Sequence, residues 1–329
     1  MRAISDRTRR LLPYAFLKGV GAVTLRKIAS DPGFQEATAS DIAEKEIRVR
    51  NALEQPDAWQ RASAEANHQI QSAEEADASI LSLLDEDYPA LLRDSKDDPC
   101  VLYVKGTLRP DSGHTVAVIG TRKPTAHGEI ITERVSEYFL GHGWSIVSGL
   151  ALGCDSIAHQ TAIKHGGHTV AVLAHGLQMV SPKSNEGLAN QILDSGGALV
   201  SEYPFGTDAI PAQFVKRDKT QAGLACGVVM VQSSLDGGSL HASRASIRYG
   251  RWLAVPFPTD KDLRDAGSAI EANMLLASDN RNEIATLLKC DDSMLDQIRI
   301  LRGKEDYHSL IELPTRTTTT NNEQQTTFL

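Results

Sequence analysis

The middle of the chain alternates between short, uniformly apolar runs and longer amphipathic stretches. The runs are rich in Val and lie at Thr115–Ile119, Ser145–Val147, Thr169–Leu173, Ala198–Ser201, Val228–Gln232 and Trp252–Val255. Continuous apolar runs of this length are typical of strands buried on both faces of a parallel sheet. Between the first two runs, Ile131, Val135 and Phe139 recur at helical spacing, and Gly141 ends the predicted helix. The pattern therefore predicts a doubly wound α/β domain with a mainly parallel sheet of about six strands.

The pattern changes on both sides of this region. Residues 1–75 have helical spacing and are rich in Ala, Glu, Gln and Arg, which predicts a small helical N-terminal domain of the helix-hairpin-helix or SAM-like type. Within it, Leu17–Ile28 contains a Gly-Val-Gly turn that either presents backbone N–H groups to a DNA phosphate or only closes a helical hairpin. We expect residues 76–112 to form connecting strands and turns, 113–288 the sheet domain, and 289–329 a short helix followed by a disordered polar tail.

Composition and charge narrow the classes of protein without identifying one. The 329 residues carry a formal net charge of −8, but residues 100–260 hold 13 Lys and Arg against 12 Asp and Glu. The predicted sheet domain is therefore nearly neutral and compatible with an anionic ligand. No apolar run approaches the roughly 18 residues that a membrane span requires, and no secretory cleavage pattern follows the basic N-terminus. We expect a cytoplasmic protein without a membrane partner.

The cysteines and histidines do not predict a metal site. Four widely separated cysteines form no CxxC pair, which argues against a disulfide framework or a zinc knuckle. Asp155 and His159 share a predicted helix face, and His165 and His168 form another close pair, but no third ligand accompanies either pair. We expect His159 to be a hydrogen-bonded structural residue, and we expect no bound metal.

Glycine, hydroxyl and basic residues gather directly after the predicted strands. They form Gly120-Thr121-Arg122-Lys123, Ser148-Gly149-Leu150-Ala151, His175-Gly176, Ser201-Glu202-Tyr203-Pro204 and the segment from Ser233 to Leu240. Ligands of open parallel sheets bind beyond the carboxyl ends of the strands, where glycine lets backbone N–H groups approach an anion and Arg clamps it. Neither a GxGxxG motif nor a P-loop is present. The loops predict a phosphate-bearing ligand; the alternative is that the glycines only close tight turns.

An ordered series of short motifs runs through these loops. It comprises Gly120-Thr121-Arg122, Ser148 to Gly153 followed by Asp155, Ala158 and His159, Gly166-Gly167-x-Thr169, Ser201-Glu202-x-Pro204-x-Gly206-Thr207, Ala222-Gly223-Leu224, Gly238-Ser239-Leu240, Gly250-Arg251 and Ala254-Val255-Pro256. The series extends from about Tyr88 to Pro256, half of the chain. It resembles the pattern of the DNA-processing protein A family (DprA, also called Smf). The helical N-terminal region is similar to the small N-terminal domain of that family.

This resemblance implies a Rossmann-like, non-enzymatic protein that binds single-stranded DNA, forms homodimers and delivers the strand to a RecA-type recombinase in transformation, competence or related recombination. It implies no cofactor and no catalytic residue. Arg122 is expected to clamp a phosphate, the loop backbones to cradle the strand, and the basic residues after Phe214 to extend the binding surface. The expected DNA-binding residues are Gly120, Thr121, Arg122, Lys123, Ser148, Gly149, Leu150, Ala151, Lys216, Arg217, Lys219, Gly238 and Ser239.

Two positions depart from the family pattern near the expected site. Asp218 stands where the family has Asn, which removes two amide donors and adds a negative charge. Its carboxylate either faces the phosphate and opposes binding, or orients Arg217 or Lys219 through an ion pair. In the Gly-Ser-Leu-x-Thr-Ala motif, Ala242 replaces the Thr, and Ser243 carries a hydroxyl one position later.

The alternative function is a nucleotide-binding or nucleotide-hydrolysing Rossmann-like enzyme, or a nucleotide sensor. Glu202 and Asp155 are the carboxylates available for general acid–base chemistry. The PGGxGTxxE pattern of related phosphoribohydrolases is missing, however, and Asp155 is more simply explained as the N-cap of the helix after the second strand. Tyr203, Phe205 and Phe214 lie near strand ends, where they either stack on bases or belong to the core.

Overall fold

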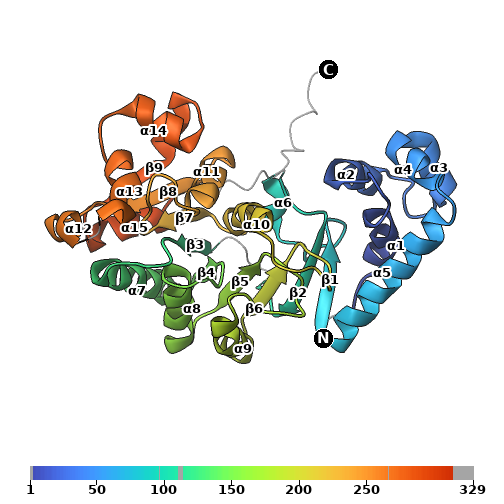
Figure 1. Ribbon diagram of the computed structural model, residues 1–329, viewed down its shortest axis with the longest axis horizontal. Helices are drawn as coiled ribbons and strands as arrows, with labels where there is room; N and C mark the ends of the chain where they lie inside the picture. Colours follow the sequence, from blue (N-terminus) through green and yellow to red (C-terminus); the bar gives the residue numbers. More distant parts are fainter. Residues whose placement is uncertain (1–2, 96, 110–113, 266, 314–329) are drawn as a thin grey trace, which may run out of the picture.

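The computed structural model describes residues 3–95, 97–109, 114–265 and 267–313 and is built around one nine-stranded sheet (Figure 1). The strands are β1 (Ala78–Ser82), β2 (Val101–Gly106), β3 (Thr115–Ile119), β4 (Ser145–Ser148), β5 (Thr169–Leu173), β6 (Ala198–Ser201), β7 (Gly227–Met230), β8 (Trp252–Pro256) and β9 (Ile298–Leu301). They lie in the order β1-β2-β6-β5-β4-β3-β7-β8-β9. The β1–β2 and β2–β6 pairs are antiparallel and the other pairs are parallel. The predicted doubly wound, mainly parallel sheet is confirmed.

Helices cover both faces of the sheet, because successive residues of a strand point to opposite sides. Val116 and Val118 of β3 belong to one core cluster, with side chains from α7 (Ala126–Gly141), α8 (Cys154–Lys164) and α15 (Tyr307–Ile311). Ala117 and Ile119 belong to a second cluster. That cluster includes side chains from α6 (Ala90–Asp94), α10 (Pro211–Gly223), α11 (Leu240–Arg248), α13 (Glu271–Leu276) and α14 (Arg281–Leu288). In Figure 1, α7, α8 and α9 (Glu186–Asp194) lie on the side opposite to α10 and α11.

The N-terminal region is helical, as predicted, and packs at the β1 end of the sheet (Figure 1). Its helices are α1 (Asp6–Ala15), α2 (Ala22–Ser30), α3 (Ala39–Lys45), α4 (Ile47–Leu53) and α5 (Ala58–Glu75). Between α1 and α2, Gly19 has a φ of +84°, a left-handed conformation that favours glycine, and Leu17 and Val20 are buried. Among the helices that the structure describes, none combines the length and the apolar composition that spanning a membrane requires.

The sheet is wider than the apolar runs predict. The six runs correspond to β3–β8, each to within two residues. β1 and β2, from the segment expected to form connecting strands and turns, form one antiparallel edge of the sheet. β9, from the segment expected to form a short helix and a disordered tail, forms the other edge. β9 is mostly half-buried, so its sequence lacks the uniformly apolar pattern of the central strands. The predicted disordered segment 315–327 lies outside the described residues.

Four 3₁₀ turns and one further helix complete the connections between these elements. They are η1 (Lys183–Asn185), η2 (Gly267–Ile270), η3 (Asp292–Gln297), η4 (Lys304–Asp306) and α12 (Asp260–Asp265). The chain proceeds outward from β3 through β4 and β5 to β6, then returns to place β7 on the other side of β3. The strand order therefore reverses between β3 and β7, and open sheets of this kind bind ligands in the crevice beyond the carboxyl ends of such a pair.

Candidate functional site

A cavity of 390 Å³ lies at this reversal point, and we name it the carboxyl-end cavity. Four segments of the chain contribute to its wall: the loop after β3, the loop after β4 with the first turn of α8, one side of α10, and the loop after β7 with the first turn of α11. The lining residues are Ile119, Gly120, Thr121, Arg122, Ala151, Asp155, Phe214, Val215, Arg217, Asp218, Gln221, Ser233, Ser234, Gly237, Gly238, Ser239, His241 and Ala242. The topology thus brings together segments that are up to about 120 residues apart in the sequence.

The loop after β3 is held close to the start of α8. A Cβ atom on Gly120 would lie 2.5 Å from the Sγ atom of Cys154, so only glycine fits there without a shift. The N–H of Thr121 donates to the carbonyl oxygen of Gln232 at 2.9 Å, and its own carbonyl accepts from the N–H of Cys154 at 3.2 Å. This fixed turn presents Arg122 at the cavity as an exposed side chain. Lys123 is exposed as well, but it is not among the lining residues.

The loop after β4 has a different role from the predicted phosphate cradle. The N–H groups of Gly149 and Ala151 lie 3.1 Å and 3.4 Å from the carboxylate Oδ2 of Asp155 and donate to it. Ser148 is buried and donates its hydroxyl to the Val118 carbonyl, while Leu150 is buried with a φ of +58°. The carboxylate of Asp155 thus occupies donors that were expected to face phosphate, and of the four loop residues only Ala151 lines the cavity.

Asp155 is also not the helix cap that its sequence position suggests. The N-cap of α8 is Gly153, with a φ of +77°, and Asp155 lies buried in the first turn of the helix. Burial raises the pKa of Asp155, while the positive charge of Arg217 and hydrogen bonds from Ala151, Ser148 and Gly149 oppose the rise. The carboxylate acts as the anchor of the β4 loop.

Of the three basic residues of α10, Arg217 alone lines the cavity, and contrary to expectation its side chain is buried. Arg217 is buried beneath the β4 loop, where its Nη1 donates to the carbonyl of Val172 at 3.2 Å and leaves no room for a side chain at Gly149. Lys216 pairs with Glu202 at 2.6 Å. Lys219 pairs with Asp97 at 3.2 Å, and neither lysine is among the residues that line the cavity.

Asp218 both lines the cavity and orients the buried arginine. Its Oδ1 lies 3.1 Å from Nε of Arg217 and accepts a hydrogen bond from Gln221 at 3.1 Å. Burial raises the pKa of Asp218 to about 7, with Asp155 adding to the rise and with Arg217 and Arg122 opposing it. The ion pair supports the orienting role, and the position in the wall also places this charge beside any anion in the cavity.

The loop after β7 supplies small polar groups to the opposite wall. Ser233 is anchored through its N–H to Asn273 Oδ1 at 3.0 Å, and its hydroxyl accepts from Ser239 at 2.8 Å. Gly238 and Ser239, two of the residues expected to bind DNA, line the cavity. Ala242 lines it too, whereas the shifted hydroxyl of Ser243 is buried and donates to the Ser239 carbonyl at 3.0 Å.

Among the carboxylate and aromatic residues that the sequence suggested for catalysis or base stacking, some line the cavity and others lie outside it. Glu202 is nearly buried in its pair with Lys216 and does not line the cavity. Tyr203 lies under the ammonium of Lys216, and Phe205 packs edge-on against Tyr103. Phe214 lines the cavity, with its ring 5.7 Å from the Arg217 guanidinium. Of the three aromatic residues near the strand ends, Phe214 alone is placed to contact a ligand there.

Several lining residues are not among the expected DNA-binding residues, although Ser233 and Ser234 belong to a loop that the sequence analysis singled out. Gln221 follows Arg217 by four residues and therefore shares its face of α10. His241 follows the Gly-Ser-Leu motif, and Ser233 and Ser234 come soon after β7. The strand-end position was a usable signal for the two serines, and the spacing of four residues from Arg217 was one for Gln221.

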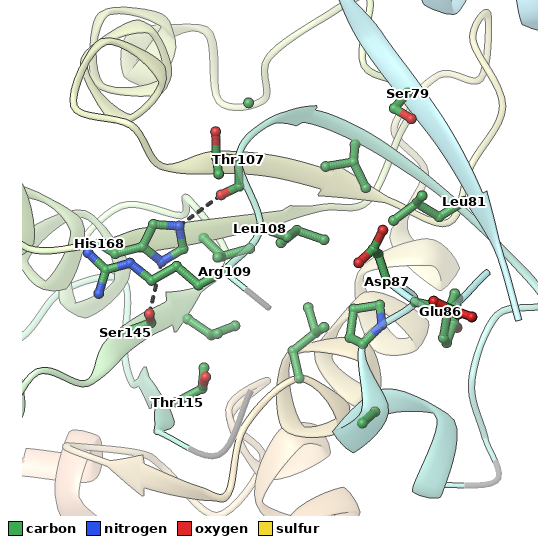
Figure 2. A pocket seen from close by; sticks show the side chains of 18 residues that line it. Ser79, Leu81, Glu86, Asp87, Thr107, Leu108, Arg109, Thr115, Ser145 and His168 are labelled. Atoms are coloured by element: carbon green, nitrogen blue, oxygen red, sulfur yellow. Dashed lines mark hydrogen bonds between the residues drawn. The ribbon is translucent and has the colours of Figure 1, made fainter. Parts of the chain in front are cut away.

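A second cavity of 370 Å³ lies at the opposite, amino ends of the strands, and Figure 2 shows the side chains that line it. We name it the amino-end cavity. Its inner wall is apolar, with Leu81, Val104, Val147 and Val170 from four strands. His168 is buried at its edge; the ring Nε2 donates to the Thr107 carbonyl at 2.8 Å, and Nδ1 lies 2.9 Å from the Ser145 hydroxyl.

Two histidines of the sheet domain, His159 and His168, are buried and hydrogen-bonded. His159 is fully buried, with Nδ1 2.7 Å from the Thr169 hydroxyl, which agrees with its predicted structural role. Burial, with the nearby charge of Arg217, lowers the pKa of His159 to about 3. Among the described residues, no group of three or more His, Cys, Asp or Glu side chains is arranged to hold a metal ion.

Together these features define a doubly wound α/β protein whose ligand crevice is built from glycine-rich strand ends at the point of strand reversal. The family model described as DNA recombination-mediator protein A matches residues 79–289, and the chain belongs to this family. The matched range includes the loops after β3, β4 and β7 and therefore the whole carboxyl-end cavity.

Curated relatives carry the names Smf and DprA. Protein Smf of Escherichia coli (strain K12) is 36% identical over 174 residues, which cover 53% of this chain and 46% of the relative. Protein Smf of Synechocystis is 31% identical over 262 residues, 78% of this chain and 65% of the relative. DNA processing protein DprA of Bacillus subtilis is 34% identical over 180 residues, which cover 54% of this chain and 60% of the relative. The chain thus spans about half to two thirds of the length of these relatives.

Two solved structures of the same family have a similar fold. The X-ray structure of DprA from Streptococcus pneumoniae superimposes with a TM-score of 0.63 at 26% identity, covering 84% of this chain and 99% of that one. DNA processing protein A from Helicobacter pylori, whose structure concerns its single-stranded DNA binding mode, gives a TM-score of 0.53 at 29% identity. That match covers 64% of this chain and 96% of the relative.

Proposed function

We propose that this chain binds single-stranded DNA at the carboxyl-end cavity and acts in DNA processing during recombination. The observation that carries the proposal is the position of Arg122, an exposed guanidinium held by a fixed turn at the mouth of a crevice where open sheets bind their ligands. The binding mode named for the Helicobacter pylori relative supports the choice of a single strand over other anions.

In this proposal the phosphate contacts differ from those expected from the sequence. Arg122 clamps one phosphate, with Lys123 near it, and the backbone and hydroxyl groups of Gly238 and Ser239 face the strand from the other wall. Phe214 offers a ring for stacking on a base, a contact worth about 1–3 kcal/mol in single-strand binders. Arg217 stabilises the pocket from beneath and does not contact the strand.

The partners and the setting belong to the proposal as the family resemblance implies them. We propose delivery of the strand to a RecA-type recombinase, assembly as a homodimer, a cytoplasmic location, and no catalytic turnover. The nucleotide-hydrolase alternative requires a carboxylate pair at the ligand. It is not favoured, because Glu202 lies outside the wall and the two carboxylates within it are already engaged, Asp155 by the β4 loop and Asp218 by Arg217.

Fluorescence anisotropy of a labelled oligo-dT strand, compared with a matched duplex over a salt series, tests the proposal. We expect tight, salt-sensitive binding that prefers the single strand. Arg122→Ala should weaken it roughly 10–100-fold, because a charge-assisted contact contributes about 1.5–3 kcal/mol. The slope of log K against log salt should decrease by about 0.7, the value for one phosphate contact on a single strand.

Lys164→Ala is the matched control, because this exposed lysine at the end of α8 lies outside the lining residues. Its affinity and salt slope should equal those of the wild type. A folded Arg122→Ala variant with unchanged affinity would remove Arg122 from the site. Negligible strand binding by the wild type, together with turnover of a nucleotide measured in parallel, would favour the alternative function.

A further inference from the structure

A third hollow, of 420 Å³, lies between α11 and the end of α14, beyond the carboxyl-end cavity. Its lining residues are Arg244, Arg248, Ala285, Thr286, Lys289, Cys290, Asp291 and Met294. Three of the eight are basic and one is acidic. On a chain with a net charge of −8, a hollow with this local excess of positive charge is suited to an anion.

One face of α11 connects this hollow to the carboxyl-end cavity. His241, Arg244 and Arg248 follow one another at i, i+3 and i+7, so they lie along the same side of the helix. His241 lines the first cavity, and Arg244 and Arg248 line the hollow. Seven residues of helix rise roughly 10 Å. The two depressions are therefore the ends of one short path along α11.

The electrostatic surroundings of His241 show that the cations lie close to this path. The pKa of His241 is lowered by partial burial and by the positive charges of Arg244, Lys289 and Lys219, which come from three different helices or helix ends. These charges make the surface between the two depressions unfavourable for another cation. By the same effect they make it favourable for a phosphate backbone.

The basic side chains along the path have different hydrogen-bond and ion-pair partners. Nε of Arg244 donates to the Leu287 carbonyl at 2.9 Å, which orients the guanidinium and leaves its Nη groups outside this bond. Lys219 and Arg248 both approach the carboxylate of Asp97, at 3.2 Å and 3.8 Å. Asp97 is thus the acidic group that competes for cations at the edge of the path. A DNA strand bound along α11 would compete with the Asp97 carboxylate for Lys219 and Arg248.

We propose that a single strand held in the carboxyl-end cavity continues along α11 and places its next phosphates in the hollow between α11 and α14. The inference rests on the proposed function and extends it by assigning the direction of the strand. A strand long enough to reach the hollow gains the contacts of Arg244, Arg248 and Lys289. A strand that only fills the first cavity does not.

Strand length therefore separates the two binding regions. The probes are labelled oligo-dT of about three and of about 25 nucleotides. At about 3.4 Å per nucleotide in a stacked strand, about three nucleotides are too short, and about 25 are long enough, to occupy the first cavity and a path of roughly 10 Å beyond it. The test variant combines Arg248→Gln with Lys289→Asn. Both side chains are exposed, and Asn suits the left-handed conformation of Lys289, whose φ is +54°. This variant keeps the bond that Arg244 makes to α14.

We expect the double variant to bind the long strand about tenfold more weakly, with a salt slope smaller by about 1.4, the value for two phosphate contacts. Its affinity for the short strand should be unchanged. Asp97→Asn should act in the opposite direction and tighten binding of the long strand only, while Lys164→Ala should change neither.

The outcomes keep this inference distinct from the proposed function. Unchanged long-strand affinity in the double variant, with tight wild-type binding, overturns the path along α11 and leaves the carboxyl-end cavity as the site. Equal losses for both strand lengths also overturn it, because the substituted residues would then act on the first cavity. Failure of the wild type to bind either strand removes the proposed function, and this inference with it.

Discussion

The two ends of the parallel sheet carry cavities of nearly equal volume, 390 Å³ at the carboxyl end and 370 Å³ at the amino end. At the carboxyl end, glycine-rich turns, an exposed arginine and buried charged groups converge from four segments. At the amino end, apolar side chains from four strands form the inner wall, Glu86, Asp87 and Arg109 lie among the other lining residues, and no glycine-rich strand ends converge among the described residues. His168 already has a partner at each ring nitrogen. Volume therefore does not distinguish them; the chemistry of the converging groups does.

The largest expected effect is on stability, and it comes from the charges of Arg217, Asp155 and Asp218 beneath the carboxyl-end cavity. Arg217→Met removes the positive charge between two buried carboxylates, Asp155 and Asp218, and should lower the free energy of unfolding by about 3–5 kcal/mol, as when one partner of a buried ion pair is removed. Denaturant titration measures the loss. Combining it with Asp218→Asn should recover part of the stability. A loss below about 1 kcal/mol would show that Arg217 does not stabilise the two buried carboxylates.

The matching substitution at the amino end should affect stability without affecting DNA. His168→Leu leaves the Thr107 carbonyl and the Ser145 hydroxyl without their partner, and should cost about 1–3 kcal/mol in the free energy of unfolding. Strand affinity should remain that of the wild type, because the residue lies at the amino ends of the strands, opposite to the carboxyl-end cavity. If anisotropy showed weaker strand binding in a folded variant, the distinction between the two ends would break down.

Asp218 should make both the free energy of unfolding and the strand affinity depend on pH. Its folded pKa of about 7 lies above the ordinary value of 3.8. Between these values the folded chain holds a proton that the unfolded chain has lost, so this group makes the free energy of unfolding fall as pH rises from about 4 to 7. Strand affinity should likewise fall as pH rises through 7, because the carboxylate in the wall becomes charged.

The variant Asp218→Asn isolates this effect. It should tighten strand binding several-fold at pH 8, where a charge beside the phosphate would otherwise repel it, and should flatten the dependence of affinity on pH between 6 and 8, roughly the range about the raised pKa. Anisotropy at several pH values is the measurement. Weaker binding at pH 8 would instead mean that the ion pair with Arg217 is what the site requires.

The smallest effect is expected for the displaced hydroxyl of α11. Ser243→Ala removes a bond to the Ser239 carbonyl that lies within the helix and faces away from the cavity. We expect a loss of less than about 1 kcal/mol in unfolding free energy and no change in strand affinity. A clear loss of affinity would place the Ser239 backbone among the groups whose position depends on this hydroxyl.

The sequence determined the central sheet and the position of the ligand crevice. Strands buried on both faces need apolar residues at nearly every position, so β3–β8 could be predicted from continuous apolar runs. The reversal of strand order between the parallel strands β3 and β7 then fixes which loops meet. The edge strand β9 was not predicted, because it is half-buried and its residues carry no comparable signal. β1 and β2 were expected as strands but not as members of the same sheet.

The roles of individual charged residues depended on tertiary structure. Lys216, Arg217, Asp218 and Lys219 are consecutive in the sequence, but 3.6 residues per turn send successive side chains to different sides of α10. Packing of that helix under the β4 loop buries Arg217, turns Asp218 toward the cavity and leaves the two lysines to pair elsewhere. Local sequence determines which elements form, because their apolar spacing is local; which charge meets which partner is decided only when distant segments come into contact.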